Sequence, residues 1–288
     1  MIGPVTFDDA LLKLYVERGV ARAVNAPGHL PTTCPRAVVC WKGVPDERRP
    51  AMGHPASELS PPHIGDLFVA SRVVVLLENL REYGGFDFAV QQATRGMRYL
   101  TRCAAVGLAR GSKVLFRGGG YAGSRVWHQA LSYAACWLRS RGSMTFGMTA
   151  PGSVPARAVA ETLRHVALAQ HVKCSPIGAR SEQTAGMWQE CGRYVLAGEL
   201  AVLAPKALLV VGTGENASAV RTHLLPVLDE RCARDVRIGS RVSSIALEGR
   251  SSPSLGAVAV LFVPHPAAPG ASSHALIDAV DQLVAAAT

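Results

Sequence analysis

Gln170-His-Val-Lys-Cys-Ser-Pro176 begins the part of the chain whose pattern predicts the fold most clearly. Directly before it, Val166-Ala-Leu-Ala-Gln170 is a short apolar run that predicts a buried strand, and Lys206-Ala-Leu-Leu-Val-Val211 predicts another. Between the two, residues 184–203 carry apolar side chains at the spacing of one helix face. A strand, an amphipathic helix and a second strand in this order predict parallel pairing through a crossover helix.

The same alternation continues on both sides of this stretch. Residues 72–77 and 257–263 are near-continuous apolar runs of strand length. Helices are expected over residues 7–24, 88–106, 127–138, 155–165 and 217–229, and Ser272 or Ser273 caps a last one. The sequence therefore predicts an α/β fold, a three-layer α/β/α sandwich with a central four-stranded, mainly parallel sheet.

The first part of the chain differs in composition from the rest. Residues 26–63 are rich in Pro, Gly and charged side chains, and this stretch is too long for a simple loop. We expect residues 1–63 to form an N-terminal helix and a proline-rich arm that packs on the domain. Residues 64–288 are expected to form that domain, because no second break in composition follows.

Open parallel sheets bind ligands beyond the carboxyl ends of their strands. In this chain that rule selects the residues after Leu77, Ala169, Val211 and Val263. Polar side chains suited to chemistry on a nucleic-acid base follow three of these four predicted strands.

The run from Gln170 to Gly212, followed later by Pro264-His265-Pro266, resembles the uracil-DNA glycosylase superfamily. Its members carry an Asn-x-x-Lys-Cys-like segment, a helix, a Pro-Lys unit leading into an apolar strand and Gly, and a late His-Pro-Ser loop. The resemblance covers residues 64–285. It implies a DNA repair enzyme that flips deoxyuridine out of the helix and hydrolyses its N-glycosidic bond. Uracil would be released and an abasic site left behind.

The resemblance places the first catalytic group after the first strand. Asn79 falls where the family holds the attacking water, although Leu80 replaces the usual Pro and the expected Asp is missing. Glu78 is therefore an expected catalytic carboxylate, and Glu82 and Asp87 are the alternatives. The other interpretation makes Asn79 an ordinary turn residue.

The base would be held from two sides. Phe86 or Phe88 would stack on it, unless both are core residues, and Gln170 takes the place of the Asn that reads the uracil edge. A side-chain amide offers one donor and one acceptor, which match O4 and N3–H of uracil. Alternatively, His171 recognises the base in place of Gln170. The interpretation without a function is that Gln170 is a surface residue at the end of its strand.

The tripeptide after the last strand is expected to hold the second catalytic group. Flanking prolines fix the backbone and orient His265, which in the family stabilises the negative charge on the departing base. Pro266 and Ala267 are expected to contact the DNA, although Ala267 lacks the hydroxyl of the family's Ser. The other interpretation is a purely structural turn.

The chain is basic, with 30 Lys and Arg against 21 Asp and Glu and a net charge of +9. Arginine forks match phosphate oxygens, so this charge is typical of a surface that binds DNA. Lys113, Arg117 and Arg125, with aromatic residues between them, are the expected DNA contacts. A solvated basic loop explains the same residues equally well.

Seven cysteines, an odd number, indicate reduced thiols and a cytoplasmic protein. No cofactor is expected, because base hydrolysis needs no metal. Cys174 and Cys191 nevertheless resemble two iron–sulfur ligands of some glycosylases, so the alternative is a 4Fe-4S cluster. Its ligands would be Cys34, Cys40, Cys174 and Cys191.

The sequence thus predicts a monomeric, cytoplasmic uracil-DNA glycosylase whose partner is uracil-containing DNA and which has no membrane segment. Three alternatives remain. The first is a glycosylase of the same fold for thymine, hypoxanthine or xanthine, and the second is a non-catalytic DNA-binding relative. The third is an unrelated α/β enzyme that acts on a small molecule.

Overall fold

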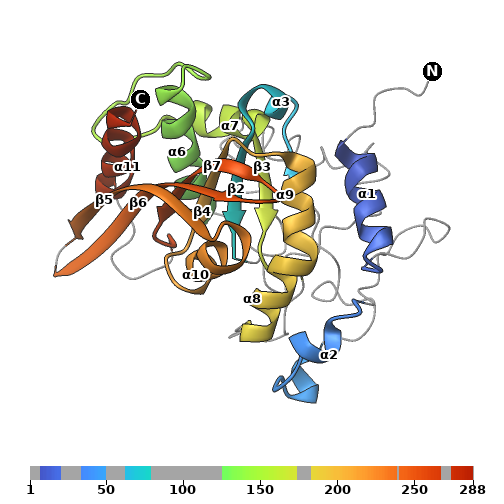
Figure 1. The fold of residues 1–288 in the computed structure, drawn as a ribbon. Helices are drawn as coiled ribbons and strands as arrows, with labels where there is room; N and C mark the ends of the chain where they lie inside the picture. The colour runs from blue at the N-terminus through green and yellow to red at the C-terminus, as the bar shows by residue number, and fades with distance from the viewer. Residues whose placement is uncertain are drawn as a thin grey trace, which may run out of the picture.

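The structure is a computed structural model that describes residues 7–20, 34–49, 62–78, 125–173, 183–238, 240–266 and 274–287. Its centre is a seven-stranded sheet with the order β1-β3-β2-β4-β7-β6-β5 (Figure 1). The strands are β1 (His63–Ile64), β2 (Val73–Leu77), β3 (Val166–Gln170), β4 (Ala207–Val211), β5 (Val227–Ile238), β6 (Arg241–Ser252) and β7 (Gly256–Val263).

The core of the sheet is parallel. β2 pairs with β3 from Val73↔Val166 to Leu77↔Gln170, and it pairs with β4 on its other side. β4 in turn pairs with β7, ending at Val211↔Val263. Every residue of β2, β3 and β4 is buried, as near-continuous apolar strands require when helices cover both faces. The predicted α/β fold with a parallel core is confirmed.

Helices lie on both faces of the sheet. One face carries α6 (Arg125–Ser140), α7 (Ala156–His165) and α11 (His274–Ala286). The other carries the helices α1 (Phe7–Glu17), α3 (Phe68–Ser71), α9 (Ala197–Leu203) and α10 (Glu215–Ala219). α8 (Ala185–Cys191) packs against Val172, beyond the end of β3. α2 (Ala37–Cys40) packs on α8, and a short 3₁₀ helix spans Asp46–Arg48.

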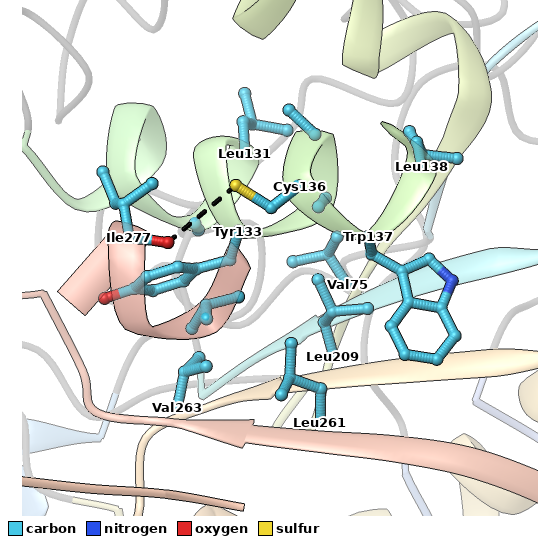
Figure 2. Close-up of a cluster of buried hydrophobic side chains, with 14 of the residues drawn as sticks. Val75, Leu131, Tyr133, Cys136, Trp137, Leu138, Leu209, Leu261, Val263 and Ile277 are labelled. Atoms are coloured by element: carbon cyan, nitrogen blue, oxygen red, sulfur yellow. Dashed lines mark hydrogen bonds between the residues drawn. The ribbon is translucent and has the colours of Figure 1, made fainter. Parts of the chain in front are cut away.

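Successive residues of a strand point to opposite faces of the sheet. Val73, Val75 and Leu77 pack in one hydrophobic cluster, whereas Val74 and Leu76 pack in the other. Figure 2 shows the first cluster, in which side chains of β2, β4 and β7 lie below those of α6 and α11. These two clusters hold the parallel strands in register and so position the strand ends.

The prediction of a four-stranded sheet was wrong, because β1, β5 and β6 extend it with antiparallel pairs. The predicted helix over residues 217–229 was wrong at its end. The observed helix α10 passes into a π-helical turn at Val220–Leu224, and β5 begins at Val227. Most side chains of β5 are exposed, so its sequence lacks the apolar pattern that marks a buried strand.

Most other predicted elements that fall on described residues agree to within a few residues. The helix expected over residues 7–24 ends earlier, at Glu17, because Gly19 takes a φ of 65° and stops it. The helix expected over residues 184–203 is interrupted by a π-helical turn at Gly192–Leu196. The predicted helix over residues 88–106 lies outside the described residues.

Described parts of the N-terminal 63 residues pack on the domain. The hydroxyl of Tyr15 in α1 donates to Glu199 Oε1 of α9 at 2.7 Å, and Thr184 Oγ1 donates to the carbonyl oxygen of Cys40 at 2.6 Å. His63 already belongs to β1, so the sheet begins at the last residue of the predicted arm. Within the described part of the chain, no helix is long and apolar enough to span a membrane.

Candidate active site at the carboxyl edge of the sheet

The ends of β2, β3, β4 and β7 meet at one edge of the sheet. The amide of His171 donates to the carbonyl oxygen of Leu77 at 2.9 Å, and the amide of Gly212 donates to that of Val263 at 2.8 Å. The residues that leave these strands are therefore neighbours across the edge. Glu78, Gln170 and His265, all expected from the sequence, lie here.

Glu78 leaves β2 and leans over the end of β4. A Cβ on Gly212 would lie 2.6 Å from Glu78 Oε1, and Gly212 has a φ of 113°, which only glycine adopts readily. The missing side chain at Gly212 therefore makes room for the Glu78 carboxylate. This half-buried group is placed between two strand ends, where it can face a positive charge that develops on a ligand.

His265 stands at the end of β7 between two buried prolines, Pro264 and Pro266. Proline fixes φ, so the backbone on both sides of the histidine is restricted. His265 is half-buried at the edge. An imidazole N–H is a hydrogen-bond donor that suits an oxygen of a base.

Gln170 ends β3, next to Leu77 in the ladder, and its side chain is only 5% exposed. A buried amide is normally hydrogen bonded, so its donor and acceptor are held in a defined orientation. Its place next to the end of β2 is that of the predicted base reader.

His171 does not reach the surface of the edge. The residue is fully buried, with Nδ1 2.9 Å from Asn216 Oδ1 and Nε2 3.1 Å from the carbonyl oxygen of Trp188. Burial lowers the pKa of His171 to about 4, so the ring is neutral at pH 7 and donates to one of these oxygens at a time. His171 is therefore unable to contact a base in this structure, and we assign it a positioning role.

Asn216, which the sequence analysis missed, ties this histidine to the strand ends. Its Nδ2 donates to the carbonyl oxygen of Val211 at 3.0 Å and lies 3.5 Å from that of Leu76. With Oδ1 turned to His171, the fully buried amide links the ends of β2, β3 and β4. Its position at the start of α10, close after a predicted strand, was the only signal in the sequence.

Lys173, two residues beyond His171, is buried in an ion pair. Its Nζ lies 2.5 Å from Glu199 Oε2, and Glu199 also accepts the hydrogen bond from Tyr15. Burial raises the pKa of Glu199, and the positive charge of Lys173 opposes this shift. The Lys of the Lys-Cys segment thus anchors the exit of β3 to α9 and α1.

Two of the predicted cluster ligands meet where α2 packs on α8. A hydrogen bond with Cys191 and burial raise the pKa of the Cys40 thiol, and the charge of nearby Cys34 raises it further. Cys174 lies outside the described residues. Within those that are described, no group of three or more His, Cys, Asp or Glu side chains is arranged to hold a metal ion. The cluster and the cofactor-free protein both stay predictions.

Several other predicted site residues lie outside the described part of the chain, as does the side chain of Arg125 at the start of α6. They are Asn79, Glu82, Phe86, Asp87, Phe88, Lys113, Arg117 and Ala267.

A pocket of about 430 Å³ lies away from this edge, and Phe146, Arg157, Glu161 and His165 are among its lining residues. His165 directly precedes β3, so the pocket lies near the amino-terminal end of that strand. It contains none of the predicted site residues.

The sequence matches no model of a known protein family and no curated protein. The geometry of the edge and the motifs in the chain are therefore the grounds for a function.

Proposed function

We propose that this chain is a DNA glycosylase that hydrolyses the N-glycosidic bond of deoxyuridine and releases uracil. The proposal rests on the placement of Glu78, Gln170 and His265 at the carboxyl ends of β2, β3 and β7, along one edge of the parallel sheet, with β4 between β2 and β7. Parallel sheets bind ligands at this edge, and these residues stand where the resemblance expects catalytic and base-reading groups. We also propose that the domain is a three-layer α/β/α sandwich whose central layer is formed by the four parallel strands.

The chemistry follows from the charges that develop when the bond breaks. The base leaves as an anion, and His265 would donate a hydrogen bond to its oxygen. The sugar becomes oxocarbenium-like, and the Glu78 carboxylate would stabilise its positive charge, with Asn79 holding the attacking water. The base must first leave the DNA stack, because a duplex shields the sugar carbon from water.

None of these steps uses a metal. If a 4Fe-4S cluster is present, Cys34, Cys40, Cys174 and Cys191 would hold it, and it would stabilise the contact between α2 and α8. Absorbance of the purified protein in the visible iron–sulfur region, together with iron analysis, distinguishes the cluster from free thiols.

Cleavage of fluorescent oligonucleotides tests the proposal. We expect abasic sites, revealed by alkali, in a strand that contains uracil and none in the matched thymine strand. Glu78→Gln should lower the rate, whereas Glu161→Gln, which removes a carboxylate from the other end of the sheet, should not. Excess folded enzyme that leaves the uracil strand intact would overturn the proposal.

A second candidate is a glycosylase of the same fold that acts on another base. Gln170 favours it, because Gln is one methylene longer than the family's Asn and is buried, so its amide would meet a base at a different depth. Strands with a thymine–guanine mispair, hypoxanthine or xanthine belong in the same assay. Cleavage of one of these, with uracil left intact, would favour this candidate.

A further inference from the structure

The hairpin of β5 and β6 extends past the rest of the sheet. The two strands pair up to Ile238↔Arg241, but the ladder between β6 and β7 stops at Ala246↔Phe262. β7 itself ends at Val263, so residues 241–244 run beyond it for about 14 Å, at about 3.4 Å per residue. β6 is antiparallel to β7, so this overhang lies at the carboxyl edge, where His265 leaves β7. Figure 1 shows the hairpin extending at the left of the molecule.

The root of this hairpin is fixed by a buried carboxylate. Glu248 is 1% exposed and forms ion pairs with Arg221 at 2.8 Å, Arg231 at 3.6 Å and Arg250. Burial opposes its ionisation, but hydrogen bonds from Arg221 and Arg250 hold the pKa of Glu248 below its usual range. Arg250 also donates to the carbonyl oxygen of Leu225 at 2.8 Å. The hairpin is therefore fixed at its root, and further along it Val236 and Ile245 pack in the same core cluster as α11.

The overhang has a different composition from the root. Arg234, Arg237 and Arg241 are exposed there, against one acidic residue, Asp235, which accepts a hydrogen bond from Ser244. Arg234 contacts Gln282 of α11. Arg237 pairs in the ladder with Val242, which is 55% exposed, so neither side chain packs in the core. Arg237 and Arg241 thus expose positive charge on the hairpin.

We propose that the overhang (residues 234–245) is a DNA-binding arm whose arginines contact backbone phosphates beside the nucleotide held at the carboxyl edge. This inference rests on the proposed function, which supplies the DNA. Its own support is geometric and electrostatic, because a rigid strand pair presents guanidinium groups on the side of the sheet where His265 lies. Guanidinium forks match phosphate oxygens, and one DNA strand carries a charge about every 3.4 Å, so an overhang of this length spans several phosphates.

Salt-dependent binding tests the arm separately from catalysis. The affinity for a fluorescent duplex without uracil is measured by anisotropy over a range of KCl concentrations. The variant is Arg237→Gln/Arg241→Gln, and the matched control is Lys206→Gln, which removes an exposed charge directly before β4 at the opposite edge. We expect the slope of log K against log[KCl] to fall in magnitude by about 2 for the double variant, and affinity to fall roughly tenfold. The control should keep the wild-type slope, and all three proteins should keep the same thermal midpoint.

The outcomes separate the two proposals. If the enzyme releases uracil but the double variant keeps the wild-type slope, the arm is refuted and the glycosylase stands. If no uracil is released but the slope falls as expected, the arm stands and the glycosylase is refuted. If the wild-type protein does not bind DNA at all, both are refuted.

Discussion

His171 and His265 occupy similar positions, one and two residues after a parallel strand, yet their surroundings are opposite. The ring of His171 is fully buried, and both of its nitrogens face oxygen atoms of Asn216 and Trp188. His265 is half-buried between two prolines at the edge. The same residue type near the end of a strand is thus fully buried in one case and only half-buried in the other.

The difference follows from what lies above each strand end. α8 and α10 close over the end of β3, and Gly192 makes this possible because it has no side chain to collide with His171. After β7, the prolines restrict the chain and keep the histidine at the edge. We therefore expect changes around His171 to alter stability and changes at His265 to alter catalysis.

The largest effect on stability is expected at Lys173, which lies two residues after His171 and is buried like it. Lys173→Met leaves Glu199 charged and buried without its partner, and we expect a loss of about 3–5 kcal/mol in the free energy of unfolding. Lys206→Met, at an exposed position, should change little. The double variant Lys173→Met/Glu199→Leu should regain most of the loss. Urea denaturation measures all three, and a wild-type midpoint in Lys173→Met would refute the role of the pair.

Acid should destabilise the protein through His171. The pKa of His171 is about 4 in the folded state and about 6.5 in an unfolded chain. The unfolded state therefore binds more protons as the pH falls from about 6.5 to about 4, and stability falls by up to about 3 kcal/mol in that window.

The comparison of two variants isolates this effect. Urea denaturation at several pH values should show it in the wild-type protein and in His265→Gln, whereas His171→Gln should lack it. Equal pH dependence of wild type and His171→Gln would show that His171 is not buried as a neutral ring.

His265→Ala should lower turnover by roughly 10²-fold, about 2.7 kcal/mol in the barrier, because it removes a group positioned at the developing base anion. The thermal midpoint should stay unchanged, since the side chain is only half-buried. Asn79→Ala is expected to have an effect of similar size. Wild-type turnover in both variants would defeat the assignment of these two catalytic groups.

A smaller effect is expected at Gly192. A Cβ there would lie 2.8 Å from His171 Nε2, so Gly192→Ala should shift the imidazole and cost about 2 kcal/mol of stability. Gly147→Ala is the matched control, because nothing lies within 4 Å of its added Cβ. Thermal unfolding of the two variants provides the measurement, and equal midpoints would contradict the close packing around His171.

Local patterns in the sequence were enough to predict the parallel strands. Apolar runs at residues 166–170 and 207–211 mark buried strands because both of their faces meet helices. The hairpin was missed because β5 pairs on one side and leaves most side chains in solvent, so no apolar pattern marks it.

The candidate site was only partly predictable for a different reason. Position after a strand identified Glu78, Gln170 and His265, since the sheet topology alone brings strand ends together. The role of His171 depends on Asn216, which lies 45 residues away in sequence. Which of two similar histidines is buried depends on such distant partners, and no local pattern reveals them.

Free uracil is the most direct measure of the central claim. Wild-type enzyme in excess over a uracil-containing strand is incubated, and released bases are identified by mass spectrometry. We expect one free uracil for each abasic site formed, and a rate that falls about a hundredfold in His265→Ala. Folded, DNA-bound enzyme that releases no base, or equal release by His265→Ala, would contradict this claim.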